Sequence, residues 1–241
     1  MYIVAILRKI KDFWDRRSSE SLIQYYRNKG ITIGANCVFR FPGSTKIDTM
    51  RPSLVEIGDN VDMNKNFTIM AHDFSHRVLL QLYGEFLSSS GPVTIGSNIY
   101  FGTDVTVLKG VTIGDNCIIG AGSIVSKSIP PNSVAAGVPC RVICSIDEYY
   151  AKRQKQWVDE AIIYANRIRQ KENREPIIDD FRPEFGLYID KHNIEYYDLD
   201  LVKIRLKDKY DEWLDQHKAV FDGFDDFLEK SRKYRNVCSK K

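Results

Sequence analysis

Through the middle of the chain, apolar residues recur at every sixth position. Counted from Ile95, the first place of each hexad is apolar six times in succession, and a small residue or a leucine follows it. The fifth place is apolar or small in the same hexads. The first places hold Ile95, Phe101, Val107, Ile113, Ile119 and Val125, and the fifth places hold Ile99, Val105, Val111, Cys117, Ser123 and Ile129. Six consecutive matches indicate a repeated structural unit.

Hexads of this kind predict a parallel β-helix, in which short strands meet at tight corners and three strands complete a coil. One coil alone cannot bury its inward face, so the coils must stack. The motif Ile-Gly-x-Asn begins at Ile33, Ile57, Ile95 and Ile113. Gly and Asn are the residues that best tolerate left-handed backbone angles, so we expect a corner at each motif. The pattern does not set the hand of the coil, and ordinary parallel crossovers are right-handed.

The end of the repeat carries a specific resemblance. Residues 120–143 read GAGSIVSKSIPPNSVAAGVPCRVI. This run resembles the last coils and exit segment of the left-handed β-helix acetyltransferases, in particular the maltose, galactoside and polysaccharide O-acetyltransferases. The resemblance covers about residues 31–143, and AGVPCRVI is its most specific piece. It implies a mainly β protein with a left-handed parallel β-helix, and homotrimers with the active site between adjacent subunits.

The repeat is interrupted twice. Residues 42–53 fit the hexad poorly, so we expect the early coils to be irregular. Residues 75–92 lose it altogether and form an excursion. Ile57 and Ile95 are 38 residues apart, two more than two coils of eighteen, so we expect the excursion to replace about one coil. Long loops in otherwise regular scaffolds usually carry function.

Helical spacing predicts helices before the repeat. In residues 3–14 an apolar face opposes a basic one. We expect this amphipathic helix to cap the β-helix or to pack on a neighbouring subunit, and the alternative is peripheral contact with the inner surface of a membrane. A second helix at residues 20–29 ends at Gly30.

Further helices are expected after the repeat. Ser145 and Glu148 form a capping box for a helix that runs to about residue 169, and aromatic stripes predict helices at 199–217 and 220–230. These stripes indicate core packing in a helical appendage. We therefore expect three regions: N-terminal helices in residues 1–30, a hexapeptide-repeat acetyltransferase domain in 31–144, and a helical C-terminal appendage in 145–241.

Composition excludes some classes of function. The 35 basic and 32 acidic residues give a net charge of only +3, which argues against nucleic-acid binding through phosphate contacts. The five cysteines show no metal-binding spacing, and free thiols suit a reducing cytoplasm. The apolar start at residues 2–7 is far shorter than a membrane span. These features predict a cytoplasmic protein, with the inner membrane surface as the alternative.

His72 is the candidate general base. It is fourth in the hexad begun by Ile69, which predicts a corner residue with its side chain turned outward, directly before the excursion. In the family that this chain resembles, a histidine immediately ahead of such a loop is the base. Imidazole can take a proton from a hydroxyl while that oxygen attacks a thioester. The alternative is a polar corner residue without a chemical role.

Asp73 and His76 next to this position could suggest a metal site. We expect none, because no third nitrogen or sulfur ligand lies nearby, and we expect Asp73 to bond a corner or to orient an imidazole. No serine or cysteine nucleophile is evident, which favours direct transfer over a covalent acyl-enzyme. The resemblance places a backbone N–H for the oxyanion near Thr103, and the alternative is that Thr103 is a plain corner residue.

The resemblance also implies a site for acetyl-CoA. Lys127 and Arg141 match the phosphate-contacting cations of the family, and Ser126 stands where the family has a hydroxyl residue. The small corner residue Ala121 allows close approach of the pantetheine arm. Tyr100 stands where several relatives have tryptophan beside the thioester. The alternative for the two cations is solvated surface charge.

We therefore expect an enzyme that moves an acetyl group from acetyl-CoA to a hydroxyl of a sugar or of a cell-surface polysaccharide precursor. One alternative is acetylation of an antibiotic or another small hydroxyl compound. The second alternative is a non-enzymatic β-helix scaffold that presents its C-terminal helices to a partner. No residues for the acceptor can be assigned, because the irregular early coils offer no match to the family.

Overall fold

The computed structural model describes residues 17–233, and the helix expected at residues 3–14 lies outside this range. The chain divides into two compact units, Met1–Tyr150 and Ala151–Lys241. In the first unit, helix α2 (Ser19–Asn28) begins at a capping box formed by Ser18 and Ser21. It ends before Gly30, whose φ of +98° is the left-handed conformation that commonly terminates helices.

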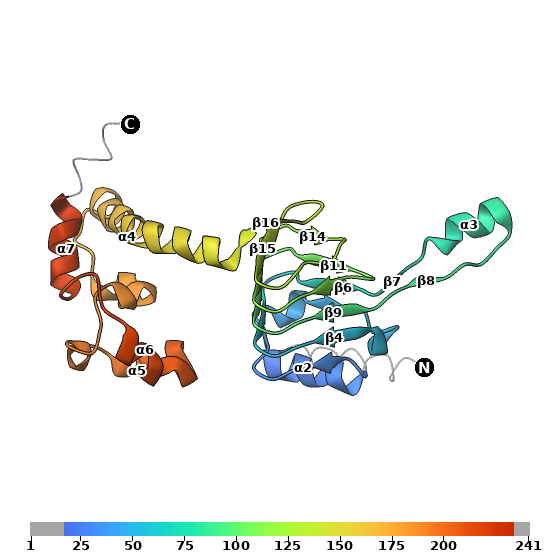
Figure 1. Ribbon diagram of the computed structural model, residues 1–241, viewed down its shortest axis with the longest axis horizontal. Helices are drawn as coiled ribbons and strands as arrows, with labels where there is room; N and C mark the ends of the chain where they lie inside the picture. Colours follow the sequence, from blue (N-terminus) through green and yellow to red (C-terminus); the bar gives the residue numbers. More distant parts are fainter. Residues whose placement is uncertain (1–16, 234–241) are drawn as a thin grey trace. The chain divides into compact units, whose positions relative to one another are not determined.

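Three sheets built from parallel strands form the body of the first unit (Figure 1). The first sheet contains β1 (Thr32–Ile33), β4 (Val55–Ile57), β9 (Val93–Ile95) and β12 (Thr112–Ile113). The second contains β2 (Val38–Phe39), β5 (Val61–Met63), β10 (Ile99–Phe101), β13 (Cys117–Ile119), β15 (Ser133–Ala136) and β16 (Arg141–Ser145). The third contains β3 (Lys46–Ile47), β6 (Thr68–Met70), β11 (Thr106–Leu108) and β14 (Ile124–Val125). Only β16 runs antiparallel to its neighbour in these three sheets of the described chain.

The chain visits the three sheets in turn, as β1, β2, β3, then β4, β5, β6, then β9, β10, β11, then β12, β13, β14. Each such visit is one coil. The later coils match the predicted eighteen residues, since Thr112 pairs with Thr94 and Cys117 pairs with Ile99. This order makes the unit mainly β and is consistent with a parallel β-helix.

The register corrects the expected place of the excursion. Val55 of β4 pairs directly with Val93 of β9, and Val61 of β5 pairs directly with Ile99 of β10. Strands 38 residues apart are thus direct neighbours. The excursion is therefore added to one coil and does not replace one. The spacing alone misled because two coils of eighteen residues and one coil with a long insertion differ in length by only two residues.

Left-handed residues form the corners, as the Ile-Gly-x-Asn motif predicts. Asn36, Asn60, Asn98 and Asn116 have φ between +54° and +58°. The amide of Asn98 donates to that of Asn116 at 2.8 Å, and Asn116 donates to Asn132 at 2.9 Å. Asparagine therefore serves twice here, because its backbone accepts the tight turn and its side chain ties successive coils together.

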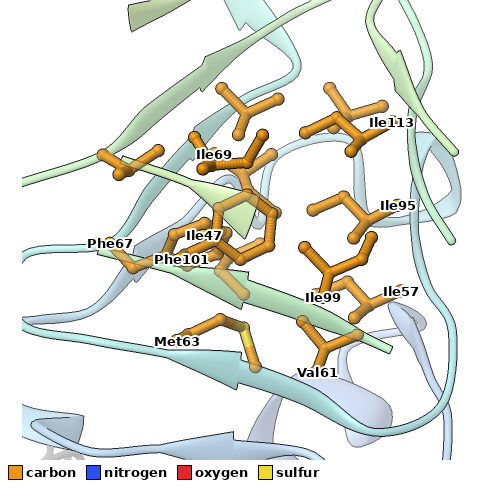
Figure 2. Close-up of a cluster of buried hydrophobic side chains, with 14 of the residues drawn as sticks. Ile47, Ile57, Val61, Met63, Phe67, Ile69, Ile95, Ile99, Phe101 and Ile113 are labelled. Atoms are coloured by element: carbon orange, nitrogen blue, oxygen red, sulfur yellow. The ribbon is translucent and has the colours of Figure 1, made fainter. Parts of the chain in front are cut away.

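The interior is filled by the hexad positions (Figure 2). All twelve first-place and fifth-place residues predicted to point inward are buried. Phe67 and Phe101 pack with their ring centroids 4.7 Å apart, and isoleucines such as Ile57, Ile95 and Ile113 stack beside them along the first sheet. Burial of this apolar stack stabilises the coils, because each one covers the inward face of the next.

The excursion is an arm that projects from the stacked strands (Figure 1). We call residues 72–90 the arm. It consists of β7 (His72–Asp73), helix α3 (His76–Tyr83) and β8 (Ser89–Ser90), and its two strands pair antiparallel. The helix ends at Gly84 with φ +72°, and its large apolar side chains are exposed to solvent: Val78, Leu80, Leu82 and Tyr83. Short 3₁₀ turns at Pro42–Ser44 and Pro52–Leu54 account for the other predicted irregularity.

Helices make up the second unit. Helix α4 (Ile146–Lys171) starts at the predicted capping box, since the Ser145 N–H donates to Glu148 and the Glu148 N–H donates to Ser145 Oγ. The 3₁₀ segments η3 (Ile178–Leu187) and η4 (Ile194–Tyr196) follow. Then come α5 (Leu199–Leu206), the 3₁₀ turn η5 (Lys207–Lys209), α6 (Tyr210–Gln216) and α7 (Phe224–Lys233).

The single helix expected at residues 199–217 is broken, because Lys207 adopts a φ of +52°. The aromatic stripes pack into a core of this unit, in agreement with the sequence, and Phe181, Tyr188 and Phe227 are among its fully buried members. In the described part of the chain, no helix combines the length and the apolar composition that a membrane crossing requires.

Candidate active site

His72 lies at the base of the arm, one residue after the coil corner at Ala71. Its side chain is 17% exposed, so it is more enclosed than an outward-pointing corner residue. Its Nδ1 is hydrogen-bonded to Oδ2 of Asp48. Its Nε2 is buried and has no hydrogen-bond partner among residues 17–233.

Asp48 follows strand β3 in the irregular first coil, and its side chain is only 6% exposed. Its own N–H donates to the carbonyl of Ile69 at 3.1 Å, which places it level with the strand that leads to His72. Its second carboxylate oxygen accepts the N–H of Met50 at 2.9 Å. The carboxylate is therefore fixed by the backbone on one side and by the imidazole on the other.

This pairing sets the tautomer of His72. A carboxylate can only accept, so Nδ1 carries the proton and Nε2 carries the lone pair in the neutral ring. A buried Nε2 with no partner is an acceptor ready for a proton. This arrangement is the one that a general base requires.

Phe74 lies beside the imidazole. Its ring stands edge-on to that of His72, with centroids 5.1 Å apart and an interplanar angle of 80°. The ring is 57% exposed, and on its other side it contacts His76, which in turn packs against Phe86 at 4.1 Å. Aromatic side chains thus line the route from His72 along the arm.

Asp73 does not orient the imidazole. Its carboxylate accepts hydrogen bonds from Lys109 Nζ and, at 2.9 Å, from the N–H of Ser75. The Lys109 ammonium and the Ser75 groups hold the pKa of this carboxyl well below its usual range. Of the two roles expected for Asp73, the structure shows the bond to a turn, and Asp48 occupies the other role. Among the residues described, no group of three or more histidine, cysteine or acidic side chains could hold a metal ion.

Tyr100 and Thr103 lie on and directly after β10, an inner strand of the second sheet. Tyr100 is on β10, is exposed, and its hydroxyl accepts the amide of Asn64 at 3.3 Å. Thr103 follows the same strand. The N–H groups of Gly102 and Asp104, on either side of it, both donate to carbonyls of adjacent coils at 2.8 Å. The Thr103 N–H has no such partner among the described residues, which leaves it available as a donor.

Ala121 is stacked on this corner in the next coil, because the Gly122 N–H donates to the Thr103 carbonyl at 2.8 Å. The coils approach very closely here, since a Cβ on Gly102 would stand 2.5 Å from the Ala121 nitrogen. Only glycine fits at that position. Ala121 itself is exposed, which leaves a backbone surface open to an approaching chain.

Ser126 and Lys127 follow β14 in the third sheet, and both are exposed. Arg141 is exposed on the exit strand β16, where its guanidinium donates to the carbonyl of Cys140 at 2.9 Å. In the described structure, no hydrogen bond, ion pair or ring contact joins His72 to any of the six expected acetyl-CoA residues.

Comparisons with known proteins give the family. Residues 92–127 match the model for bacterial transferase hexapeptide (six repeats). The chain is 43% identical over 142 residues to galactoside O-acetyltransferase from Escherichia coli (strain K12), an alignment that covers 56% of this chain and 66% of the relative. It is 30% identical to a maltose O-acetyltransferase from Clostridium difficile 630, over 57% of this chain and 83% of that chain, with a TM-score of 0.41. The chain belongs to the hexapeptide-repeat acetyltransferases.

Two further matches cover a similar or a smaller share of this chain than the galactoside O-acetyltransferase from Escherichia coli does. A solved galactoside acetyltransferase in complex with coenzyme A is 34% identical over 58% of this chain and 80% of that one, with a TM-score of 0.40. Relatives from Staphylococcus aureus are 51% identical over 75 residues, which are 35% of their length. The chain thus spans 66% or less of these curated relatives.

Sequence reasoning missed Asp48. It lies in residues 42–53, where the hexad breaks, so its register with the later coils could not be counted. The signal was Ile47, an apolar residue that proves to be level with Ile69 and so marks a first place of the hexad. Aligning those two isoleucines places an acidic residue beside the coil end that carries His72.

Proposed function

We propose that this hexapeptide-repeat acetyltransferase is built on a left-handed parallel β-helix and moves an acetyl group from acetyl-CoA to a hydroxyl of a sugar. The proposal is supported by the 43% identity to a galactoside O-acetyltransferase and by the site around His72. The observation that carries it is the His72 imidazole, whose Nδ1 is bonded to Asp48 and whose buried Nε2 has no partner in the described chain.

The residues of the chain then have the following roles. Acetyl-CoA, when bound, supplies the acetyl group as a thioester. His72 Nε2 accepts the proton of the acceptor hydroxyl while the oxygen bonds to the carbonyl carbon. Asp48 holds the ring and stabilises its charged form. His72 then returns the proton to the departing sulfur as the carbon–sulfur bond breaks, so that protons balance and no covalent enzyme intermediate is needed.

The Thr103 N–H is the proposed donor to the oxygen of the reacting carbonyl. A backbone donor held by the flanking bonds of Gly102 and Asp104 needs no reorganisation during the reaction, which makes it effective in stabilising developing charge. Tyr100 would border the thioester, and the open backbone at Ala121 would admit the pantetheine arm. These assignments rest on the match of each position to the family.

Lys127 and Arg141, with Ser126 between the coils, are the proposed phosphate contacts. We expect the double variant Lys127→Ala with Arg141→Ala to raise the KM for acetyl-CoA about tenfold or more and to change kcat little. Phosphate contacts remote from the thioester act equally in the ground and transition states. Titration calorimetry with CoA provides the direct check, and unchanged affinity in the double variant would remove both residues from the site.

The active site is proposed to form between copies of the chain in a homotrimer. The outward side of the third sheet carries Met70 and Ile124 as exposed apolar residues, and Leu108, which pairs with Met70, is half-buried there. His72 makes no direct contact with the expected acetyl-CoA residues in the described chain, and a second copy seated on this face is the proposed source of the acetyl-CoA residues that complete its site.

We expect light scattering to give about three times the 27.8 kDa mass of one chain. Mixing His72→Ala chains with Lys127→Ala, Arg141→Ala chains provides a functional check at an acetyl-CoA concentration well below the raised KM, because a shared site would let some mixed trimers regain activity at that concentration. A fully active monomer would contradict both the trimer and the shared site.

The activity itself is tested with a panel of acceptors. We expect release of free CoA thiol from acetyl-CoA when galactosides, glucosides or short glycans are supplied, and little release without an acceptor. Selective acetylation of an antibiotic would instead favour the xenobiotic alternative. Absence of transfer to every hydroxyl compound, together with no CoA binding, would favour a scaffold.

A further inference from the structure

Lys109 sits in the coil that follows the arm. The register pairs Val107 with Ile69 and Leu108 with Met70, so Lys109 is level with Ala71 and lies directly beside the point where the arm leaves the core. Its side chain is 32% exposed. It plays no part in the acetyl-CoA site described above.

The ammonium of Lys109 contacts both strands of the arm. It donates to the carboxylate of Asp73 on β7 and to the hydroxyl of Ser89 on β8. Asp73 and Ser89 are cross-strand partners in the register of the arm, and the next pair is His72 with Ser90. One cation therefore bridges the two strands one residue pair away from the candidate base.

Backbone bonds complete this junction. The Gly91 N–H donates to the Ala71 carbonyl at 2.9 Å, and the Gly110 N–H donates to the Pro92 carbonyl at 2.7 Å. These bonds fix where the arm enters and leaves the coil. They do not close the arm beyond its first residues, because β7 and β8 are only two residues long.

We propose that Lys109 is a positioning residue that closes the base of the arm and thereby holds strand β7, with His72, in its catalytic orientation. The proposal rests on the proposed role of His72 and adds a residue from the next coil to it. His72 is held from one side by Asp48 of the first coil and from the other by β7. Without the cation, Asp73 and Ser89 have no common partner, and the short hairpin depends on its few backbone bonds alone.

The Asp73 carboxylate suits this role over a wide pH range. Its pKa is held below its usual range by Lys109 first and then by Ser75. A lowered pKa means that the ion pair contributes fully above the ordinary pKa of an aspartate and is lost only as the pH falls through the lowered value. The junction is therefore closed at neutral pH.

The test uses Lys109→Met, which keeps the aliphatic chain and removes the cation. We expect amide hydrogen exchange over residues 72–91 to become about tenfold faster or more, with the remaining coils unchanged. We expect kcat to fall about ten- to a hundredfold, because a small displacement of the base is costly, and the KM for acetyl-CoA to stay within about twofold. Lys109→Arg keeps the cation and should retain most of the protection and the rate.

Two further variants complete the design. Ser89→Ala removes one of the two acceptors without removing the charge, and we expect an intermediate increase in exchange even if Lys109→Met folds poorly. Lys155→Met, at an exposed position of α4, is the matched control and should match the wild type in exchange and rate. Unchanged exchange over the arm in both Lys109→Met and Ser89→Ala would overturn the proposal. If neither the wild type nor any variant acetylates an acceptor, the proposed function fails. The exchange measurement still shows whether Lys109 closes the base of the arm.

Discussion

Replacing His72 with alanine is expected to lower kcat by at least about a hundredfold, because a general base contributes in this range or above. The affinity for acetyl-CoA should stay near that of the wild type, since the base acts in the transition state and does not hold the thioester donor. Steady-state kinetics with a saturating sugar acceptor, together with calorimetry for CoA, separates the two effects.

The matched control for this variant is His192→Ala. His192 is exposed in the second unit and has no role in the proposed chemistry. We expect it to retain full activity. A His72→Ala protein that turns over at the wild-type rate would remove the central assignment, and one that also loses CoA binding would point to a structural effect.

Replacing Asp48 with asparagine is expected to lower kcat by about a hundredfold or more, since the amide can donate to Nδ1 and so favour the tautomer with a proton on Nε2. That tautomer cannot accept the proton of the acceptor hydroxyl. The KM for acetyl-CoA should change little. The variant keeps the shape of the side chain, so its melting temperature reports whether the loss is chemical or structural.

A suitable control is Asp179→Asn, at an exposed ion pair with Arg182 in the second unit. This substitution should leave the kinetics unchanged because exposed pairs contribute little. If Asp48→Asn and the wild type show the same kcat over the accessible pH range, Asp48 does not orient the base. Reduced activity that Asp48→Glu partly restores would support the need for a carboxylate.

The regular part of the fold could be predicted from the sequence because its rule is local. Each inward position, such as Ile95 or Phe101, is set by a six-residue count, and each corner residue, such as Asn98, by its tolerance of a left-handed turn. Both features repeat along the chain, so a wrong assignment at one position shows up as a mismatch at the next repeat. The buried hexad positions and the Asn corners are confirmed.

The irregular parts could not be predicted because they depend on pairings between distant residues. Asp48 meets His72 only because two short 3₁₀ turns change the length of the first coil, and no local pattern reports that length. Likewise, β4 lies against β9 although 38 residues separate their paired positions, and only the register shows it. Position and family resemblance suggested His72 as a candidate, but the pairing with Asp48 required the three-dimensional structure.

In the second unit, the sequence pattern predicted the presence of helices but not where one of them breaks. The stripe of apolar residues at 199–217 was consistent with one helix, and a left-handed Lys207 divides it into two. Helical propensity gives no reason to break at a lysine, so no local signal predicts this break. The assignments of His72, Tyr100, Thr103, Ala121, Ser126, Lys127 and Arg141 stay predictions, because they concern bound molecules and a neighbouring chain.

The insertion of the arm into a single coil has a consequence for how such enzymes can diverge. The coils before and after the arm stay paired, since Val107 of β11 lies level with Ile69 of β6, so the stacking of the coils is maintained across the insertion. A change in the arm alters the surroundings of His72 without altering the stack that supports it. We therefore expect a change in the arm to affect the proposed choice of acceptor more than the stability of the coils, and exchanging the arm between family members would test this expectation.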